Sequence, residues 1–489
     1  MKSRALRFAC AVGLLIVGGL AGTPDVRALD QQRRRDGQVD PGRARAAVFR
    51  TDVPDHPADV ILGRPTADSV TLSILFYRDS RATVAYGPYG SPSSNKTGIQ
   101  EFKAGEPTLV VLNRLKPDTR YTYSIRIENA ANDAAASVIT GAFRTQRAPG
   151  AAFTFTVTAD SHLDERTDPA VYARTLRSAA ADDPDFHVDL GDTFMTERHP
   201  DRASAARQYL AQRYYFGLIA HAAPLFLALG NHDGEGAPRG RGGGDSSAWA
   251  LAMRTRHFPN PVPDAFYSGN TSTDPEGNLL QDYYAWRWGD ALFIVLDPFR
   301  YSDHRGGDDG WSWTLGPDQY QWLDRTLAKS GARFTFVFIH HLVGGADRQA
   351  RGGAEASRLF EWGGMNADGT PGFNARRPGW VAPIHGLLVK HGVTAVFHGH
   401  DHLHARQERD GIVYQEVPQP ADGRGGSARS AGEYGYKSGV ILAGTGYVRV
   451  RVAPEAGLVE FVDTGNAALP VRVADRCPVT PAVRPAGPR

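Results

Sequence analysis

Cysteine is scarce in this chain: of its 489 residues only Cys10 and Cys477 carry a thiol. Cys10 lies in an N-terminal segment that we expect to be removed, so the mature chain could form no internal disulfide. Disulfides are what small exported domains use when their cores are insufficient. The fold must therefore be stabilised by packing rather than by cross-links.

An excess of charge of either sign is also lacking. The chain has 55 Lys and Arg against 53 Asp and Glu, which gives a formal net charge of +2. This balance gives no reason to expect nucleic acid or an anionic membrane as the main partner. The apolar and charged fractions, 41% and 22%, are those of an ordinary globular protein. The length exceeds one ordinary core, so we expect two domains.

An apolar run does stand at the N-terminus, but it is short. Lys2, Arg4 and Arg7 precede the run Phe8–Ala21, and Val26-Arg27-Ala28 offers a small-residue cleavage site. This pattern predicts a secretory signal peptide over residues 1–28 and export to the periplasm or the medium. The run is shorter than the roughly 20 residues of a spanning helix, so we expect no membrane span after cleavage. The alternative is a buried N-terminal helix.

A β-rich domain is predicted over residues 59–147, after an Arg-, Asp- and Pro-rich linker over residues 29–58. Short alternating segments separated by turn residues are typical of a β-sandwich. The expected strands are Ser69–Phe76, Ala82–Tyr86, Thr108–Leu115, Arg120–Ile127 and Ser137–Thr145. The string Leu115–Tyr123 resembles the corner of fibronectin type III domains, where the first tyrosine, here Tyr121, bonds back to the chain before its strand. We interpret this domain as a spacer or docking module.

A second domain is predicted over residues 150–465, followed by a C-terminal tail over residues 466–489. Apolar strand-like segments alternate there with helix-like segments, which indicates an α/β sheet with helices on its faces. The expected strands are Phe153–Thr158, His187–Leu190, Leu225–Leu229, Leu292–Leu296, Thr335–Ile339 and Thr394–Phe397, with two more after Val448. The expected helices are Asp168–Ala181, Ala203–Ala222, Pro317–Ser330 and Pro383–His391.

Five short polar motifs follow strands of this second domain. They are Asp160-Ser161-His162, Gly191-Asp192, Gly230-Asn231-His232-Asp233, His340-His341 and Gly399-His400-Asp401-His402. Ligand sites of open α/β sheets form beyond the carboxyl ends of strands, so distant motifs can meet there. Carboxylate, imidazole and amide ligands without thiolate suit divalent cations. A further match, Asp185-Phe186-His187, begins a strand and is interpreted as a decoy.

This pattern resembles the calcineurin-like metallophosphoesterase superfamily, and its pairing with a fibronectin-like domain resembles purple acid phosphatases. The resemblance implies a four-layer αββα sandwich, preceded by an all-β sandwich, with two metal ions. It implies that one metal is bound by Asp160, His162, Asp192 and His402, and the other by Asp192, Asn231, His340 and His400. It places His232 beside the substrate phosphate, and it favours His340 over His341 because Val337-Phe338-Ile339-His340 fits the family's Val-x-x-His pattern.

One position departs from purple acid phosphatases. They carry a tyrosine three residues after the bridging aspartate, where this chain has Met195. The resemblance therefore does not extend to an iron–tyrosinate site, and we expect two divalent ions chosen from Mn, Zn, Fe and Co.

The expected activity is hydrolysis of a small-molecule phosphate ester, most simply a monoester. A hydroxide that bridges the two metals, which share Asp192 as a ligand, would attack phosphorus in line while His232 stabilises charge or protonates the leaving oxygen. A phosphodiesterase or nucleotidase would use the same site. A non-catalytic surface-binding module is the alternative from another class. Because all proposed ligands follow Phe153, we expect residues from there onward to be sufficient for activity; the oligomeric state stays open.

Overall fold

The computed structural model describes residues 48–128, 138–236, 243–302, 309–465 and 470–482. The predicted signal peptide and most of the predicted linker lie outside these ranges. Among the helices in the described ranges, none combines the length and apolar character needed to cross a membrane.

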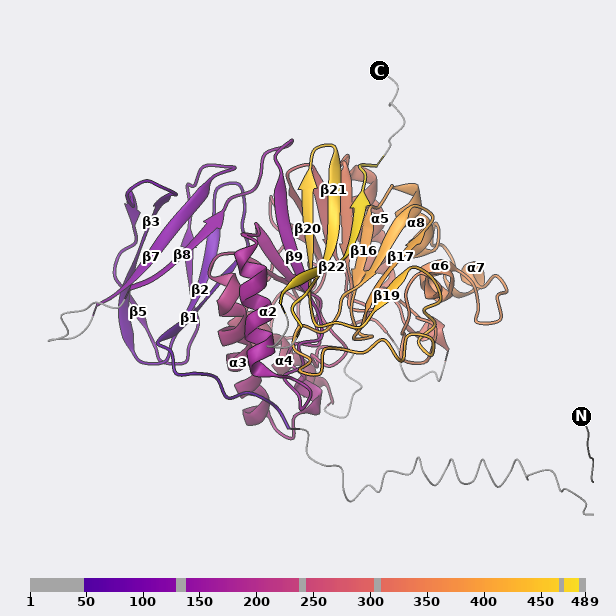
Figure 1. Cartoon of the computed structure of the whole chain (residues 1–489), viewed down its shortest axis with the longest axis horizontal. Helices are drawn as coiled ribbons and strands as arrows, with labels where there is room; N and C mark the ends of the chain where they lie inside the picture. The colour runs from indigo at the N-terminus through magenta and orange to yellow at the C-terminus, as the bar shows by residue number, and fades with distance from the viewer. Residues whose placement is uncertain (1–47, 129–137, 237–242, 303–308, 466–469, 483–489) are drawn as a thin grey trace, which may run out of the picture. The chain divides into compact units, whose positions relative to one another are not determined.

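The first domain is a β-sandwich of two antiparallel sheets (Figure 1). One sheet has the order β1-β2-β6, and the other has the order β4-β3-β7-β8 with β5 also paired to β3. The strands are β1 (Ala58–Gly63), β2 (Val70–Phe76), β3 (Ser80–Pro88), β4 (Asn95–Lys96), β5 (Gln100–Phe102), β6 (Thr108–Leu112), β7 (Arg120–Glu128) and β8 (Val138–Arg144). Alternate residues of β7 are buried, as expected of a strand with one face on the core.

The tyrosine corner predicted from the sequence is present. The hydroxyl of Tyr121, at the start of β7, accepts a hydrogen bond of 2.9 Å from the backbone N–H of Lys116. The Tyr121 ring is buried and stacks on Phe143 with centroids 5.4 Å apart. The bond fixes the entry of the chain into β7, and the β-rich region has the character of a fibronectin type III-like domain.

The second domain contains two sheets. The six-stranded sheet has the order β11-β10-β9-β20-β21-β22, and the eight-stranded sheet has the order β12-β13-β14-β15-β16-β18-β17-β19. The strands of the first are β9 (Phe153–Thr158), β10 (Phe186–Asp189), β11 (Leu225–Leu227), β20 (Gly446–Ala453), β21 (Ala456–Asp463) and β22 (Arg472–Val479). Those of the second are β12 (Ser268–Gly269), β13 (Tyr284–Trp288), β14 (Ala291–Val295), β15 (Phe334–Phe338), β16 (Ala395–His398), β17 (His404–Arg409), β18 (Ile412–Glu416) and β19 (Val440–Leu442).

Helices cover the outer faces of both sheets. They are α2 (Pro169–Ala181), α3 (Arg202–Ala220), α4 (Gly243–His257), α5 (Gly316–Lys329), α6 (Phe360–Gly363), α7 (Phe373–Arg376) and α8 (Ile384–Lys390). Short 3₁₀ turns span η1 (Thr196–Arg198), η3 (Gly310–Ser312) and η4 (Ala356–Arg358). The start of α2 follows from its sequence, since Asp168 caps the N–H groups of Ala170 and Val171 and Pro169 occupies the first turn.

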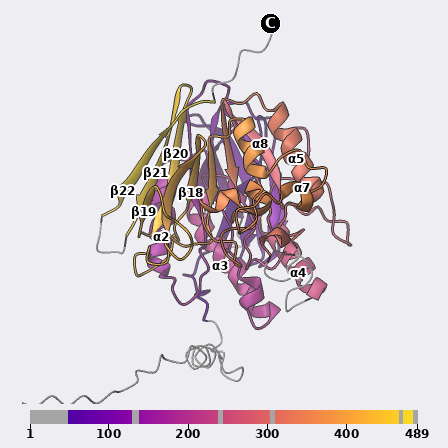
Figure 2. The same cartoon turned by 90° about the vertical axis from the view of Figure 1, so that its right-hand side faces the viewer.

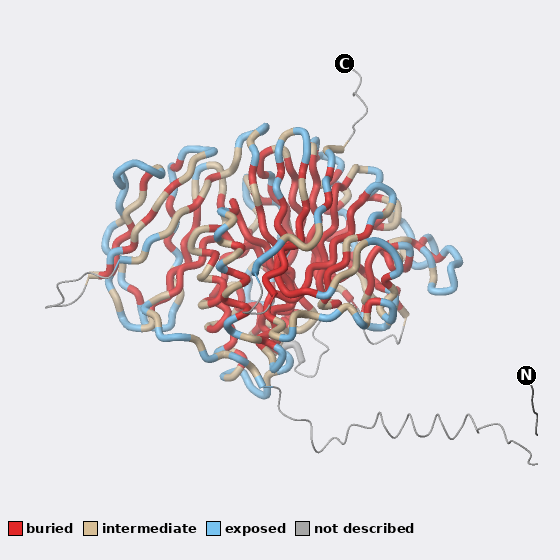
Figure 3. The backbone as a smooth tube through the Cα atoms, viewed as in Figure 1, coloured by how far each residue is buried: buried red, intermediate tan, exposed pale blue. Residues whose placement is uncertain are grey.

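The domain is layered α/β/β/α, as the resemblance implied. Side chains of α2 and α3 pack with Tyr447 and Val462 of the six-stranded sheet, while α5 and α8 pack on the eight-stranded sheet (Figure 2). Between the two sheets lies a phenylalanine-rich core that includes Phe155, Phe293 and Phe336. This central zone is the most continuously buried part of the chain (Figure 3).

Several segments differ from the sequence analysis, among them β1, β13, β17 and β18, which it did not predict. Residues 472–479, predicted as tail, form β22 and pair with β21, so the sheet extends beyond residue 465. Three strands, not two, therefore close the domain. Part of the predicted linker is ordered against the second domain, since Phe49 stacks on His199 and the N–H of Arg50 donates to Leu163 O. The helix α4 was not predicted, because Gly243 and Gly244 at its start are poor helix formers.

Candidate metal centre and active site

The five polar motifs meet where parallel strands end. In the six-stranded sheet, β9, β10 and β11 run parallel, and the motifs beginning at Asp160, Gly191 and Gly230 follow their carboxyl ends. In the eight-stranded sheet, β15 and β16 run parallel and end just before His340 and His400. Each sheet thus contributes part of one site, as expected for the carboxyl edges of α/β sheets.

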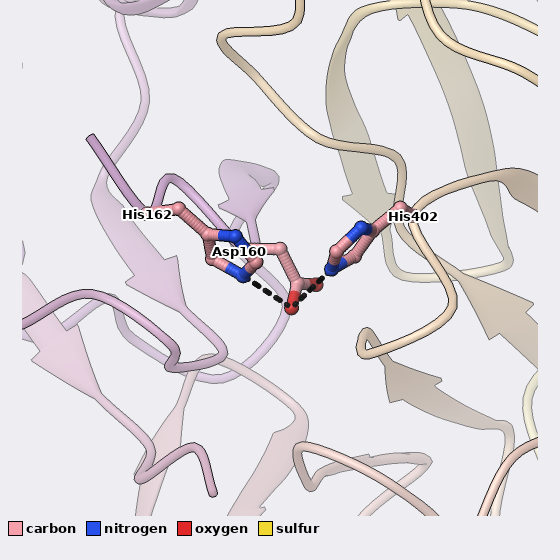
Figure 4. A group of neighbouring side chains, drawn as sticks. All are labelled: Asp160, His162 and His402. Atoms are coloured by element: carbon pink, nitrogen blue, oxygen red, sulfur yellow. Dashed lines mark ion pairs between the residues drawn. The ribbon is translucent and has the colours of Figure 1, made fainter. Parts of the chain in front are cut away.

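The first cluster of ligand atoms comprises Asp160, His162 and His402, with the three atoms within 4.8 Å of one another (Figure 4). Oδ1 of Asp160 lies 3.7 Å from Nε2 of His162 and 3.5 Å from Nε2 of His402. The other oxygen, Oδ2, accepts a 2.8 Å hydrogen bond from the backbone N–H of His400. Oδ1 of Asp160 and Nε2 of His162 are buried without a hydrogen-bond partner among the described residues. A cation between these two atoms would satisfy the lone pairs that have no hydrogen-bond partner.

The second cluster comprises Asp192, His340 and His400. Oδ2 of Asp192 lies 3.5 Å from Nε2 of His340 and also 3.5 Å from Nε2 of His162 in the first cluster. Oδ1 of Asp192 is held by a 2.8 Å hydrogen bond from the backbone N–H of His232. Asn231 joins this cluster, with Oδ1 3.1 Å from Nε2 of His340. The carboxylate of Asp192 therefore lies between the two clusters.

Backbone carbonyls fix which ring nitrogen of two histidines faces the site. Nδ1 of His340 donates to Leu190 O at 3.0 Å, which leaves Nε2 as the lone-pair nitrogen. Nε2 of His400 donates to Gln349 O at 2.7 Å, which leaves Nδ1. Outer hydrogen bonds of this kind orient metal-binding imidazoles and set their tautomers.

The glycines of the motifs have a steric reason. A Cβ on Gly230 would lie 2.3 Å from Oδ1 of Asp192, and one on Gly399 would lie 2.6 Å from Oδ2 of Asp160. Both glycines therefore let backbone approach a carboxylate more closely than any side chain permits. This close approach explains why glycine precedes Asn231 and His400.

The loops that carry the site residues adopt a conformation that is costly for non-glycine residues. Positive φ angles occur at Asp160 (60°), His162 (50°), Asp192 (55°), His400 (80°) and His402 (61°). Each such residue costs of order 1 kcal/mol, and strain of this type concentrates at functional sites. The surrounding packing must hold these loops in place.

The electrostatics of the site couple its acids to its imidazoles. Burial disfavours the charged form of Asp160, but the close imidazoles of His162 and His402 outweigh this effect and hold the pKa of that carboxyl well below its usual range. Burial likewise disfavours the imidazolium of His340, but the charge of Asp192 raises the pKa of His340 to about 9. Burial, together with the charge of His340, lowers the pKa of His400 to about 4.

His232 lies at the rim of the site, and a carboxylate holds its ring. Its Nδ1 is 2.7 Å from Oε1 of Glu197, in the turn η1. Burial lowers the pKa of His232, but the charge of Asp192 and the bond to Glu197 raise it above its usual value. Asp233 does not contact His232 through its carboxylate: it accepts backbone N–H bonds from Gly230, Asp192, Thr193 and Phe194, and so fixes the two ligand loops.

The decoy motif lies away from this site. His187 is fully buried between the hydroxyls of Thr156 and Thr158, at 2.8 and 2.9 Å. Asp185 pairs with Arg147 at 2.6 Å. Both residues therefore have structural partners, in agreement with the sequence interpretation.

Several residues at the site carried no local sequence signal. Glu197 contacts His232 across the fold, and Gln208 and Gln212 of α3 contact the ligand loops. His341 follows His340 directly and is the other histidine of that motif. Its ring is buried between Trp313 and Phe299, with centroids 4.5 and 4.9 Å away, and lies 5.2 Å from the ring of His400. These contacts depend on tertiary structure, which motif spacing does not reveal.

A known protein-family model covers the domain that contains this site. The family model described as calcineurin-like phosphoesterase matches residues 153–404, which is more than half of the chain. The chain belongs to the calcineurin-like phosphoesterase family. It is accordingly a phosphoesterase hydrolase, and its two clusters of metal-binding residues point to a dinuclear metal site.

Solved structures share this fold at low sequence identity. The structure of PhoD superposes with a TM-score of 0.62 at 16% identity, covering 89% of this chain and 95% of PhoD. The purple acid phosphatase PPD1 from yellow lupin (Lupinus luteus) superposes with a TM-score of 0.57 at 14% identity, covering 87% of this chain and 74% of that enzyme. No curated protein matches the chain in sequence. At these identities the likeness supports the fold, including the β-rich domain before the α/β domain.

Proposed function

We propose that the chain is a two-metal phosphomonoesterase in which Asp192 bridges the ions. The observation that carries this proposal is the position of Oδ2 of Asp192, 3.5 Å from Nε2 of both His162 and His340. One carboxylate oxygen thus faces ligands of both clusters. Two ions at such a site supply Lewis acidity and lower the pKa of a bound water toward 7.

The proposed ligands fall into two sets that share Asp192. Metal one would be held by Asp160, His162, Asp192 and His402, and metal two by Asp192, Asn231, His340 and His400. The chemistry of the donors fits divalent Mn, Zn, Fe or Co. The buried, unpartnered Oδ1 of Asp160 and Nε2 of His162 support the first set.

His232 is the proposed catalytic residue beside the substrate. Its Nδ1 is engaged by Glu197, which leaves Nε2 for the substrate phosphate or the leaving oxygen. Its raised pKa favours the protonated ring, which can neutralise developing charge and donate a proton. The backbone N–H of His232 donates to Asp192, so the same residue ties the proposed acid to the bridging carboxylate.

We propose that the preferred substrate is a phosphomonoester. The support for this preference is the shared fold with purple acid phosphatase PPD1, whose name states the activity of that protein. A phosphodiesterase or nucleotidase would use the same ligands. Export is likewise proposed, on the basic and apolar N-terminal segment of residues 1–28. The mass of the protein recovered from the periplasm or medium tests it, since retention of residues 1–28 would refute cleavage.

The activity test separates substrate class from metal dependence. The full chain, stripped and reloaded with Mn, Zn, Fe or Co, is assayed on a chromogenic phosphomonoester, the matching diester and a nucleotide. We expect two ions per chain by elemental analysis and the highest kcat/KM on the monoester. Asp192→Asn is expected to lose both ions and activity. Full activity without metal, or in Asp192→Asn with both ions retained, would refute the two-metal assignment; faster diester hydrolysis would refute only the monoester preference.

A further inference from the structure

Two glutamines of α3 lie directly beneath the ligand loops. Gln208 and Gln212 are one helical turn apart and both fully buried. Residues at this spacing share one face of a helix. A buried amide costs free energy unless its N–H groups and its oxygen are hydrogen-bonded. The hydrogen bonds of these two side chains therefore show which parts of the structure they hold.

The amide of Gln208 joins the two loops through their backbone. Its Nε2 donates to the carbonyl of His162 at 2.7 Å and to the carbonyl of Thr193 at 2.8 Å. Its Oε1 accepts from Nε2 of His199 at 2.7 Å. One amide group therefore ties a proposed ligand of metal one to the residue that follows the bridging Asp192.

Gln212 repeats the arrangement one turn along the helix. Its Nε2 donates to Oγ of Ser161 at 2.8 Å and to the carbonyl of Thr193 at 2.8 Å. Its Oε1 accepts from the hydroxyl of Tyr172 at 3.1 Å. The carbonyl of Thr193 thus accepts from both glutamines. The loops starting at Asp160 and at Gly191 are each hydrogen-bonded to α3.

The loops need such support because their backbone conformation is strained. Direct bonds run from the N–H of Asp160 to Gly191 O and from the N–H of His162 to Asp192 O. Asp160, His162 and Asp192 all have positive φ. The carbonyls of His162 and Thr193 point away from the ligands toward α3, where the glutamines satisfy them.

We propose that Gln208 and Gln212 are positioning residues that set the separation of the Asp160-x-His162 turn from the Asp192 loop, and thereby the affinity and geometry of metal one. The proposal rests on the two-metal function above. It predicts an unequal effect on the two metals. The two glutamines donate to the carbonyl of His162, to Oγ of Ser161 and to the carbonyl of Thr193. These atoms belong to the Asp160–His162 turn and to the residue after Asp192, whereas the hydrogen bonds of the glutamines in the described residues include none to Asn231, His340 or His400.

The test replaces each glutamine with methionine, which keeps the length of the side chain and removes its hydrogen bonds. Full-length Gln208→Met and Gln212→Met are titrated with Mn²⁺, with binding followed by calorimetry and by the spin-coupled electron paramagnetic resonance signal of a manganese pair. Loss of an outer partner of a metal ligand typically costs about 10- to 100-fold in affinity. We expect that loss at one site only, with a spectrum of isolated rather than coupled Mn²⁺ at limiting metal.

The matched control is Gln319→Met. Gln319 is a fully buried glutamine on α5 that donates to Asp297 O at 2.8 Å and accepts from the N–H of Asp297 at 2.9 Å, and its hydrogen bonds go to residues outside the five ligand motifs. The Gln319→Met variant removes an equally buried amide. A loss of metal affinity caused by general destabilisation would therefore appear in this variant too. Thermal unfolding of the metal-free variants establishes that each is folded.

The outcomes separate this proposal from the proposed function. If the wild type binds fewer than two Mn²⁺, the two-metal function fails. If the wild type binds two and Gln208→Met shows wild-type affinities and coupling, the positioning role is refuted. Equal losses in all three variants, or equal losses at both metals, also refute it. If Gln208→Met does not fold, Gln212→Met decides by the same criteria.

Discussion

A buried cation, Arg213, joins the β-sandwich to the α/β domain, and its replacement is the most informative stability experiment. Arg213 of α3 is fully buried. Its guanidinium donates to Oγ and to the carbonyl of Ser73 in the sandwich, both at 2.9 Å, and to the carbonyl of His257. Beside it, Ile61 of β1 packs with Tyr209 and Phe194. The sandwich therefore contacts the helix that supports the ligand loops.

The expected cost of Arg213→Met follows from these contacts. Three hydrogen bonds from a charged donor contribute together about 6 kcal/mol. Burial lowers the pKa of Arg213 to about 10, which corresponds to a cost of about 3 kcal/mol for keeping the group charged. The difference predicts a loss of about 3 kcal/mol in the free energy of unfolding, similar to the loss from breaking other buried charge contacts.

The distribution of tryptophan provides the assay. All eight tryptophans lie between residues 249 and 380, and the sandwich over residues 59–147 has none. Tryptophan fluorescence in urea thus reports on the α/β domain alone, while far-ultraviolet circular dichroism reports on both domains. We expect coincident transitions in the wild type. In Arg213→Met we expect the fluorescence transition to move to lower urea, with a free energy of unfolding smaller by about 3 kcal/mol.

Arg144→Met is the control, because Arg144 also bridges the domains but pairs with Asp183 at 3.1 Å in an exposed position. Exposed pairs of this kind contribute at most about 1 kcal/mol. A loss in Arg213→Met no larger than in Arg144→Met would refute the reasoning. The buried Arg213 also argues against the expectation that residues from Phe153 onward suffice, since removal of the sandwich would leave this cation without Ser73.

Three further predictions concern the site. His232→Ala is expected to lower kcat by roughly 10²–10⁴-fold with unchanged metal content. His187→Ala removes a fully buried imidazole bonded to threonines and should keep its metals; metal loss on elemental analysis in His187→Ala alone would show that Asp185-Phe186-His187 belongs to the metal site. Metal affinity is expected to fall as pH falls below about 9, because burial lowers the pKa of His340 but the charge of Asp192 raises it to about 9, so that a proton competes with the ion; calorimetric affinities that do not change between about pH 6 and pH 9 would contradict this. The metal-loaded protein is expected to show no visible charge-transfer band, because Met195 is a soft neutral ligand unsuited to ferric iron; a band in the absorption spectrum of the active protein would refute it.

Much of the fold is predictable from sequence because the buried strands are continuous apolar runs. The strand Phe153–Thr158 has the predicted bounds, and the helices α2, α3, α5 and α8 begin and end within two residues of prediction. The strand β22 was not predicted, because Arg472, Arg476 and Pro478 interrupt its apolar pattern and its pairing with β21 spans a loop. Edge strands tolerate proline and charge, so their sequences resemble loops.

The site also has residues that the sequence predicts and residues that it does not. The proposed ligands are identifiable because each stands just after a strand, where topology brings strand ends together. The partners that hold them are not, because their roles come from contacts across the fold. Glu197 reaches His232, and Gln208 reaches His162, through positions that no local spacing marks. A glutamine on a helix has an unremarkable sequence context, and only its buried amide identifies its role.

The two carboxylates at the centre of the site show how the fold prepares it. Asp160 follows a strand of the six-stranded sheet, yet its Oδ2 is held by the N–H of His400 from the eight-stranded sheet. Asp192 has its Oδ1 held by the N–H of His232. In each carboxylate one oxygen is satisfied by backbone, and the other is turned toward imidazoles. Because the proposed ligands come from both sheets, ions bound there would join the two layers directly, so that metal affinity and the packing of the sheets must be coupled.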